Sequence, residues 1–210
     1  MDSIIFDFDG TLVNTKPFIR KCYIDTTKKI DASLLDRANK ILIGPTLKDT
    51  INEILGTKNK KLFNKFFKEF IHLHDNAVEL NTLAFENVLN TLDLLKHKKI
   101  HMSIVTNKRK YPTNKIINYL GWSKYFEYVL CSDSFSKTKS KTELIKYLLS
   151  KKEYYSTGLL LGDTTNDCYA ANDNSIKFAR AMWGYGENEN WENKCINYSL
   201  ININDLSNIF

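Results

Sequence analysis

The stretch DFDGTLVNT, residues 7–15, directly follows the apolar, β-branched run SIIF at residues 3–6. A run of this kind is typical of a short buried strand. Asp and Gly are poor strand formers, so we expect the strand to end where DFDGT begins. Two carboxylates, two residues apart, then stand at the end of a strand. They either cap a turn or carry out chemistry, and their partners elsewhere in the chain decide between these interpretations.

The apolar pattern changes twice along the chain. Between about residues 16 and 81, four segments place apolar residues three and four positions apart, as amphipathic helices do. From residue 82 onward, strand patterns alternate with helix patterns, which predicts a parallel sheet with helices on both faces and right-handed crossovers. We therefore expect a Rossmann-like, doubly wound α/β core of residues 1–15 and 82–210. An inserted helical domain, residues 16–81, should lie beside the carboxyl end of the first strand as a lid.

The composition is that of a globular protein without a membrane segment. Of 210 residues, 43 % are hydrophobic, and no apolar run approaches the ~20 residues that span a bilayer. No signal peptide is visible at the N-terminus. The four cysteines lie far apart without CxxC spacing, so we expect reduced thiols, most of them buried, no zinc site and a cytoplasmic location. They are Cys22, Cys131, Cys168 and Cys195.

The charge balance is basic, with 30 Lys and Arg against 24 Asp and Glu and a net charge of +6. Such a charge attracts small anions such as phosphate esters, and it also suits a nucleic-acid partner. The chain is rich in Lys, Asn and Ile, a bias that AT-rich coding produces by itself. The charge therefore does not choose between these partners.

Polar clusters follow several of the predicted strands. Ligands of an open parallel sheet bind outside the carboxyl ends of its strands, so these clusters should converge on one cleft. Each alone is explained by a turn or a helix cap, but all together are not. The clusters are Asp7 with Asp9, Thr106 with Asn107, the lysines around residues 137–141, and Asp163 with Asp167.

The predicted cleft has the ligands of a hard cation. Asp7, Asp9 and Asp163 offer oxygen atoms to an octahedral ion, with Asp167 as a fourth candidate. No His or Cys cluster suggests zinc or iron, because His72 and His74 are two apart on a helix and point in different directions. Mg²⁺ beside a lysine and a hydroxyl group is typical of phosphoryl transfer. One carboxylate then serves as nucleophile, and its neighbour two residues on shuttles the proton.

The four motifs resemble those of a known family. DFDGTLVNT, VTNK at 105–108, a downstream lysine and LLLGDTTND at 159–167 look like the ordered motifs of the haloacid dehalogenase-like hydrolase superfamily. The insert has the size and place of that superfamily's helical C1 cap. IGPTL at 43–47 and WGYG at 183–186 are similar to stretches of its phosphoglycolate phosphatase-like branch.

The resemblance implies a role for each residue of the cleft. Asp7 would be the nucleophile that forms an aspartyl-phosphate, and it would also ligate Mg²⁺. Asp9 would protonate the leaving oxygen and then activate water, while its main-chain carbonyl binds Mg²⁺. The remaining roles are phosphate binding by Thr106, Asn107 and Gly10, and Mg²⁺ ligation by Asp163 and, directly or through water, by Asp167.

The lysine of the third motif has two candidates. KTELIKYLL at 141–149 fits the branch's pattern of a lysine that opens a helix, which selects Lys141. Lys139 fits an alternative form of the motif, KPxP, although its prolines are missing. The chain also departs from the family at Asn14, where many relatives carry Asp, and at FEN 85–87, where relatives often have Pro-Gly.

These observations predict a Mg²⁺-dependent phosphatase that acts on a small phosphate monoester, phosphoglycolate-like, a sugar phosphate or a nucleotide. Other interpretations are a polynucleotide end phosphatase, a sugar phosphomutase of the same fold, and an inactive binding module. Haloalkanoic acid dehalogenation needs neither Mg²⁺ nor a second acid, so Asp9 with Asp163 argues against it. We expect a monomer or a homodimer.

Overall fold

The computed structural model describes residues 1–56, 59–192 and 194–210. Its centre is a six-stranded parallel sheet in the order β5-β4-β1-β6-β7-β8. The strands are β1 (Ser3–Phe6), β4 (His101–Thr106), β5 (Tyr128–Cys131), β6 (Leu159–Gly162), β7 (Lys177–Ala181) and β8 (Tyr198–Leu200). Strand β1 ends at Phe6, immediately before DFDGT, as the sequence predicts.

The register of the central strands brings their carboxyl ends together. Phe6, the last residue of β1, pairs with Ile104 of β4 and with Leu161 of β6. The residues that follow these three strands therefore emerge at one edge of the sheet.

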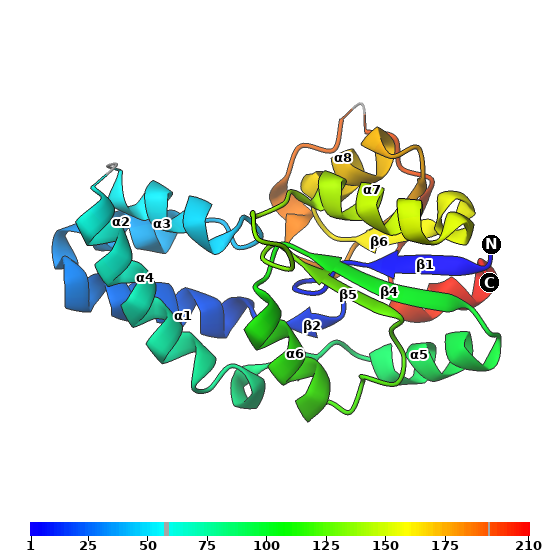
Figure 1. Cartoon of the computed structure of the whole chain (residues 1–210), viewed down its shortest axis with the longest axis horizontal. Helices are drawn as coiled ribbons and strands as arrows, with labels where there is room; N and C mark the ends of the chain where they lie inside the picture. The colour runs from blue at the N-terminus through cyan, green and yellow to red at the C-terminus, as the bar shows by residue number, and fades with distance from the viewer. Residues whose placement is uncertain (57–58, 193) are drawn as a thin grey trace.

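Helices cover both faces of the sheet, which confirms the doubly wound fold (Figure 1). Side chains of β1 alternate between the faces, with Ile4 and Phe6 in one core and Ile5 in the other. The first core is completed by α5 (Val88–His97), α6 (Lys110–Tyr119) and the 3₁₀-helix η5 (Ile203–Asn208), and the second by α7 (Lys141–Lys151) and α8 (Thr165–Asp173).

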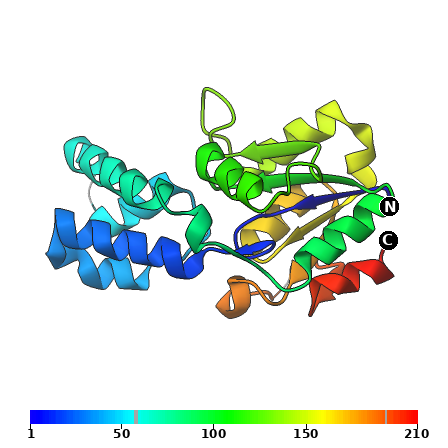
Figure 2. The ribbon, with the colours of Figure 1, turned by 90° about the horizontal axis from the view of Figure 1, so that it is seen from below.

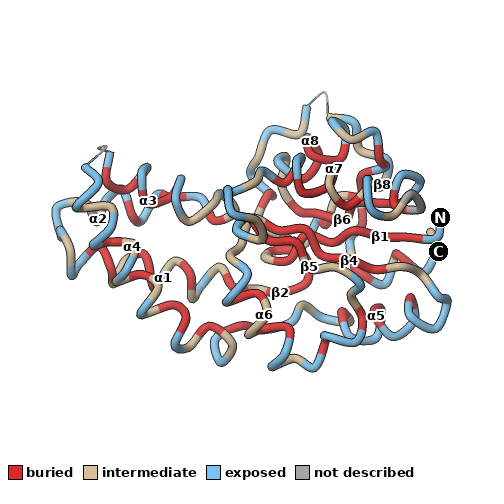
Figure 3. Tube along the Cα trace, in the orientation of Figure 1, coloured by how far each residue is buried: buried red, intermediate tan, exposed pale blue. Residues whose placement is uncertain are grey.

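A helical block stands beside the carboxyl ends of the strands, with a core of its own (Figures 2 and 3). Tyr23 and Phe70 belong to this core, with ring centroids 4.4 Å apart, on its side that faces the sheet domain. The loop of residues 41–46, which contains the Gly44-Pro45 turn, joins two of its helices and faces the sheet. The block contains α1 (Lys16–Ile30), η1 (Ala32–Leu34), α2 (Leu35–Lys40), α3 (Leu47–Leu55) and α4 (Lys60–Asp75).

A short antiparallel ribbon lies where the chain leaves and re-enters the sheet domain. Strand β2 (Val13–Asn14) pairs with β3 (Leu83–Ala84). Two-residue strands have no periodicity, so the sequence analysis does not predict them. Asn87, in the FEN stretch, adopts a left-handed backbone with φ of 62°, a conformation that Asn tolerates better than most residues.

The remaining turns of helix are η2 (Glu79–Asn81), η3 (Glu153–Thr157) and η4 (Gly186–Asn188). Within the described residues, none of the helices combines the length and apolarity needed to cross a membrane. The four cysteines are free thiols, and all but Cys195 are buried, as expected.

The end of α4 ties the helical block to the sheet domain. His74 is buried, stacks between Phe18 and Phe70, and meets the Asp75 carboxylate with its Nδ1 at 2.8 Å. The same carboxylate oxygen accepts a hydrogen bond from Arg109, at the start of α6. Burial lowers the pKa of His74 to about 4, although Asp75 opposes the shift; the cations of Lys108 and Arg109 lower it further. His72, by contrast, is exposed.

We expect His74 to make the fold sensitive to mild acid. Below pH ~6.5 the unfolded chain binds a proton on this imidazole that the folded chain refuses until about pH 4, so stability falls as the pH falls through this window. Over the whole window the loss is on the order of 3 kcal/mol. Urea unfolding at pH 7.5 and pH 5 should show a smaller loss for His74→Gln than for wild type. The control His72→Gln should behave as wild type, and an equal loss in His74→Gln would contradict the assignment.

Candidate active site

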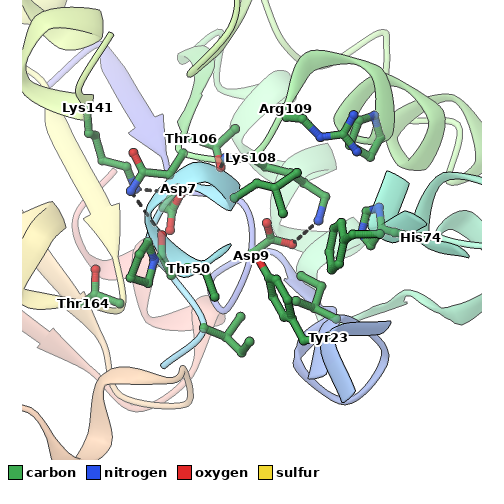
Figure 4. Close-up of a pocket in the computed structure, with 18 residues that line it drawn as sticks. Asp7, Asp9, Tyr23, Thr50, His74, Thr106, Lys108, Arg109, Lys141 and Thr164 are labelled. Atoms are coloured by element: carbon green, nitrogen blue, oxygen red, sulfur yellow. Dashed lines mark hydrogen bonds and ion pairs between the residues drawn. The ribbon is translucent and has the colours of Figure 1, made fainter. Parts of the chain in front are cut away.

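A buried ion cluster forms where β1, α7 and α8 meet. Figure 4 shows two of its members, Asp7 and Lys141. The Lys141 Nζ lies 2.8 Å from Asp7 Oδ1 and also bonds Asp167 Oδ1. Lys141 is the first residue of α7, whose start is fixed by a capping box between Ser140 and Glu143. All three charged groups are buried. The helix start thus delivers an ammonium group to the carboxylate at the end of β1.

Asp163 completes the cluster from the end of β6. Its Oδ1 accepts a hydrogen bond from the Thr11 hydroxyl at 3.1 Å, and its Oδ2 accepts one from the Tyr185 N–H at 2.6 Å. The site has no room for side chains around this carboxylate. A Cβ at Gly10, where φ is +86°, would lie 2.2 Å from Asp163 Oδ2, and one at Gly184 would lie 2.1 Å from its Cβ.

The cluster places three carboxyl groups around one ammonium group. Burial raises the pKa of Asp7 and that of Asp163 above their ordinary values, and each is raised further by neighbouring carboxylates. Lys141 stays charged because the pull of Asp167 and Asp7 on its pKa outweighs its burial. Its single charge therefore faces three carboxylates.

The donor set fits a divalent cation with a preference for oxygen. Oxygen atoms of Asp7, Asp163 and Asp167 all lie within 4.8 Å of one another. A 2+ ion between them would balance the charge that Lys141 leaves over, and carboxylate oxygens are the ligands that hard cations take. The structure thus brings together three of the four carboxylates predicted to ligate a metal.

Asp9 lies at the wall of a cavity between the sheet domain and the helical block, and two donors contact one of its carboxylate oxygens. The Thr15 hydroxyl is 2.5 Å from Asp9 Oδ1. The Lys108 Nζ is 3.1 Å from the same oxygen (Figure 4). Lys108 directly follows the predicted phosphate-binding pair Thr106 and Asn107. Thr15 is the last residue of DFDGTLVNT, and Lys108 is the last residue of VTNK. The motifs therefore contain both residues, but the sequence does not predict that they contact Asp9.

The two candidate lysines are placed differently. Lys141 is in the cluster, whereas the Lys139 Nζ lies over the Phe135 ring, 5.4 Å from its centroid. The geometry therefore favours Lys141 as the motif lysine.

The predicted phosphate binders lie at the edge of the cavity or behind it. Thr106 Oγ1 accepts a hydrogen bond from the Lys108 N–H at 3.1 Å, and Asn107 Nδ2 donates to the Gly44 carbonyl of the helical block at 3.2 Å. The Gly10 N–H donates to the Val13 carbonyl at 2.9 Å. Gly10 has a packing role, because its lack of a side chain makes room for Asp163.

A cavity of about 70 Å³ lies between the sheet domain and the helical block. The sheet side carries Asp7, Asp9 and Lys141, and the block side is mostly apolar, with Tyr23 and Thr50 among its polar groups. Lys108 and Arg109 give the wall beside Asp9 positive charge (Figure 4). The residues that line the block side are Ile19, Tyr23, Ile43, Gly44, Pro45, Leu47, Thr50, Phe70 and His74.

Asn14 lies at the ribbon between the two parts of the chain. It pairs with Leu83, and its Oδ1 is 3.3 Å from the hydroxyl of Tyr185. That tyrosine belongs to the WGYG stretch, whose Trp183 also donates to the Thr11 carbonyl at 3.0 Å. Asn14, where the chain departs from the family pattern, therefore contacts the WGYG loop.

Comparison with known proteins places this geometry in a family. The sequence model of the family described as haloacid dehalogenase-like hydrolase matches residues 4–181. A phosphoglycolate phosphatase of Aquifex aeolicus is 30 % identical over 188 residues, which cover 88 % of this chain and 86 % of that protein. Pyrophosphatase PpaX of Oceanobacillus iheyensis is 26 % identical over 208 residues, which cover 99 % of this chain and 95 % of that protein.

Solved structures agree with the fold. The crystal structure of a predicted phosphoglycolate phosphatase from Haemophilus somnus superposes with a TM-score of 0.87 at 22 % identity, covering 100 % of this chain and 97 % of that chain. The four motifs, the parallel sheet and the family match all lead to the same assignment. The chain belongs to the haloacid dehalogenase-like hydrolase family and is a phosphoric monoester hydrolase.

Proposed function

We propose that the protein is a Mg²⁺-dependent phosphatase that hydrolyses a small phosphate monoester through an aspartyl-phosphate on Asp7. The observation that carries this proposal is the buried Asp7 carboxylate, 2.8 Å from Lys141 and beside Asp163 and Asp167, at the wall of a small cavity. Phosphoryl transfer depends on the positioning of reactants and the neutralisation of charge, and this cluster supplies both.

The two aspartates of DFDGT divide the reaction into two steps. An Asp7 oxygen attacks phosphorus, the bond to the leaving oxygen breaks, and Asp9 gives that oxygen a proton. Asp9 then takes a proton from water, whose oxygen attacks phosphorus and releases phosphate from Asp7. Lys141 orients Asp7 in both steps through the contact at 2.8 Å.

The phosphoryl group would be held by Thr106 and Asn107. Because Thr106 Oγ1 accepts from the Lys108 N–H, its own hydrogen is available to a phosphoryl oxygen. Asn107 uses one N–H on the Gly44 carbonyl and keeps a second for the phosphoryl group.

We infer that a metal ion binds at the cluster, because three carboxyl groups there share one ammonium group. Asp7, Asp163 and the main-chain carbonyl of Asp9 would hold Mg²⁺, with Asp167 as a direct or water-mediated ligand. When bound, Mg²⁺ neutralises charge on the phosphoryl oxygens.

The helical block, residues 16–81, would act as the cap that closes over the substrate and excludes water. The cavity of about 70 Å³ suits a small ester. Lys108 and Arg109 suit an anionic leaving group, such as the carboxylate of phosphoglycolate or the second phosphate of pyrophosphate. The free thiols suit a reducing cytoplasm.

The nucleophile is tested by Asp7→Asn. Release of phosphate from p-nitrophenyl phosphate should fall by at least about a thousandfold, because an amide oxygen does not form the phosphoenzyme. Asp2→Asn, at an exposed aspartate, is the matched control and should keep wild-type turnover. Turnover that survives Asp7→Asn in a folded protein would refute the mechanism.

The metal is tested without turnover. At constant ionic strength, Mg²⁺ should raise the unfolding temperature of the wild type, because an ion bound only by the folded chain adds about 2.7 kcal/mol at a hundred times its Kd. Asp163→Asn should lose most of this shift, and chelation should stop phosphate release by the wild type. A wild type that ignores Mg²⁺, or an Asp163→Asn variant with the full shift, would contradict the site.

The lysine is tested by a matched pair of substitutions to methionine, which keeps the length of the side chain. Lys141→Met should lower kcat/KM by about a hundredfold, the usual effect of removing one preorganised charge from such a site. Lys139→Met should stay within about twofold of wild type, because its ammonium group lies over Phe135 and not in the cluster. The reverse ranking would make Lys139 the motif lysine.

A further inference from the structure

Helix α1, the first element of the helical block, has an unusual start. Its N-cap residue is Thr15, a residue type whose hydroxyl commonly caps a helix, yet this side chain makes no capping hydrogen bond. Its backbone lies in the helical region, with φ of −107° and ψ of −9°, and not in the extended region typical of an N-cap. The Thr15 hydroxyl instead donates to Asp9 Oδ1 at 2.5 Å.

The cap comes from the other end of the chain. The hydroxyl oxygen of Tyr185 accepts hydrogen bonds from the N–H of Thr15 at 2.8 Å and from the N–H of Lys16 at 3.0 Å. Pro17, the next residue, has no N–H to satisfy. One tyrosine hydroxyl therefore serves the first two donors of the helix, which would otherwise lack partners.

The Tyr185 hydroxyl also contacts three oxygen atoms. After accepting two N–H groups it has one hydrogen left, and the acceptors within reach are Asn14 Oδ1 at 3.3 Å, the Val13 carbonyl at 3.4 Å and Thr15 Oγ1 at 3.4 Å. Burial raises the pKa of this tyrosine, so the hydroxyl keeps its proton. Its backbone N–H is bound to Asp163, which anchors the residue on the sheet domain.

We propose that Tyr185 is a positioning residue for the general acid: by accepting the N–H groups of Thr15 and Lys16, it holds Thr15 in the conformation in which its hydroxyl orients Asp9 toward the leaving group. This inference rests on the proposed function, in which Asp9 protonates the leaving oxygen. Tyr185 does not touch the reacting atoms in this assignment and acts through Thr15.

The physical basis is the backbone conformation of Thr15, which the two hydrogen bonds to Tyr185 stabilise. Without the Tyr185 hydroxyl, the N–H groups of Thr15 and Lys16 lose their acceptor, and an unmade hydrogen bond at a buried donor costs about 1–3 kcal/mol. The present conformation of Thr15 then loses its advantage over the extended backbone of an ordinary N-cap, in which the Thr15 hydroxyl accepts from the N–H of Phe18. A change to that backbone takes the hydroxyl away from Asp9 and leaves the carboxylate with Lys108 as its partner.

The experiment compares two substrates of similar shape whose leaving groups differ in their need for a proton. p-Nitrophenolate leaves without an acid, whereas the phenolate of phenyl phosphate is more basic and gains from protonation. For Tyr185→Phe, kcat/KM should fall about tenfold with phenyl phosphate and less than about twofold with p-nitrophenyl phosphate. Tyr119→Phe, the same change at an exposed tyrosine, should alter neither value.

A second variant links the effect to Thr15. Thr15→Val removes the hydroxyl, keeps the branched shape and should produce the same leaving-group-dependent loss. The double variant should lose no more than either single variant, because both changes break one chain of contacts. An equal loss on both substrates, or losses that multiply in the double variant, would overturn the proposal. Failure of the proposed function would appear separately, as turnover that survives Asp7→Asn.

Discussion

The buried ammonium group of Lys141 is the interaction on which the site depends. Removing a carboxylate from water costs several kcal/mol, and an uncompensated buried charge is strongly destabilising. Asp7 and Asp167 avoid that outcome because one lysine touches both. The fold delivers the three groups from separate elements, the end of β1, the first residue of α7 and the first turn of α8. A shift of any of these elements would leave a charge without its partner, so the cluster also fixes their relative positions.

The same cluster explains the crowding of glycines around Asp163. Its carboxylate must lie close to Asp7 and Asp167, which leaves it against the backbone of the turn after β1 and of the loop after β7. Gly10 and Gly184 are at these contacts, and a methyl group at either would overlap Asp163. Two glycines of the sequence are thus required by packing, since the backbone approaches a carboxylate that hydrogen bonds from Thr11 and from the Tyr185 N–H hold in place.

The sequence predicted those features that depend on pattern and order. The alternation of strands and helices gave the doubly wound sheet, and the position of each polar cluster after a strand predicted that Asp7, Asn107 and Asp163 would gather at one edge. The two-residue ribbon escaped prediction because it has no period. The sequence also did not predict the roles of Thr15 and Tyr185, although Thr15 lies in DFDGTLVNT and Tyr185 lies in WGYG. Contacts between residues 170 positions apart depend on how two loops meet in space, which a local pattern does not encode.

The contact between the helical block and the sheet domain combines apolar and polar groups. Val78 of the inserted segment is buried in a core of the sheet domain, and Phe18 packs against that core and against the core of the block. Polar contacts join Asn107 to Gly44, Arg109 to Asp75, and Tyr185 to the Lys16 N–H. A polar tie exchanges for hydrogen bonds to water at a net cost of about 0.5–1.5 kcal/mol, far less than exposing an apolar core. One of these polar contacts, at Asn107, uses a residue that we assign to the phosphoryl group. In the proposed function, a side chain that would bind substrate therefore also holds the two parts of the chain together.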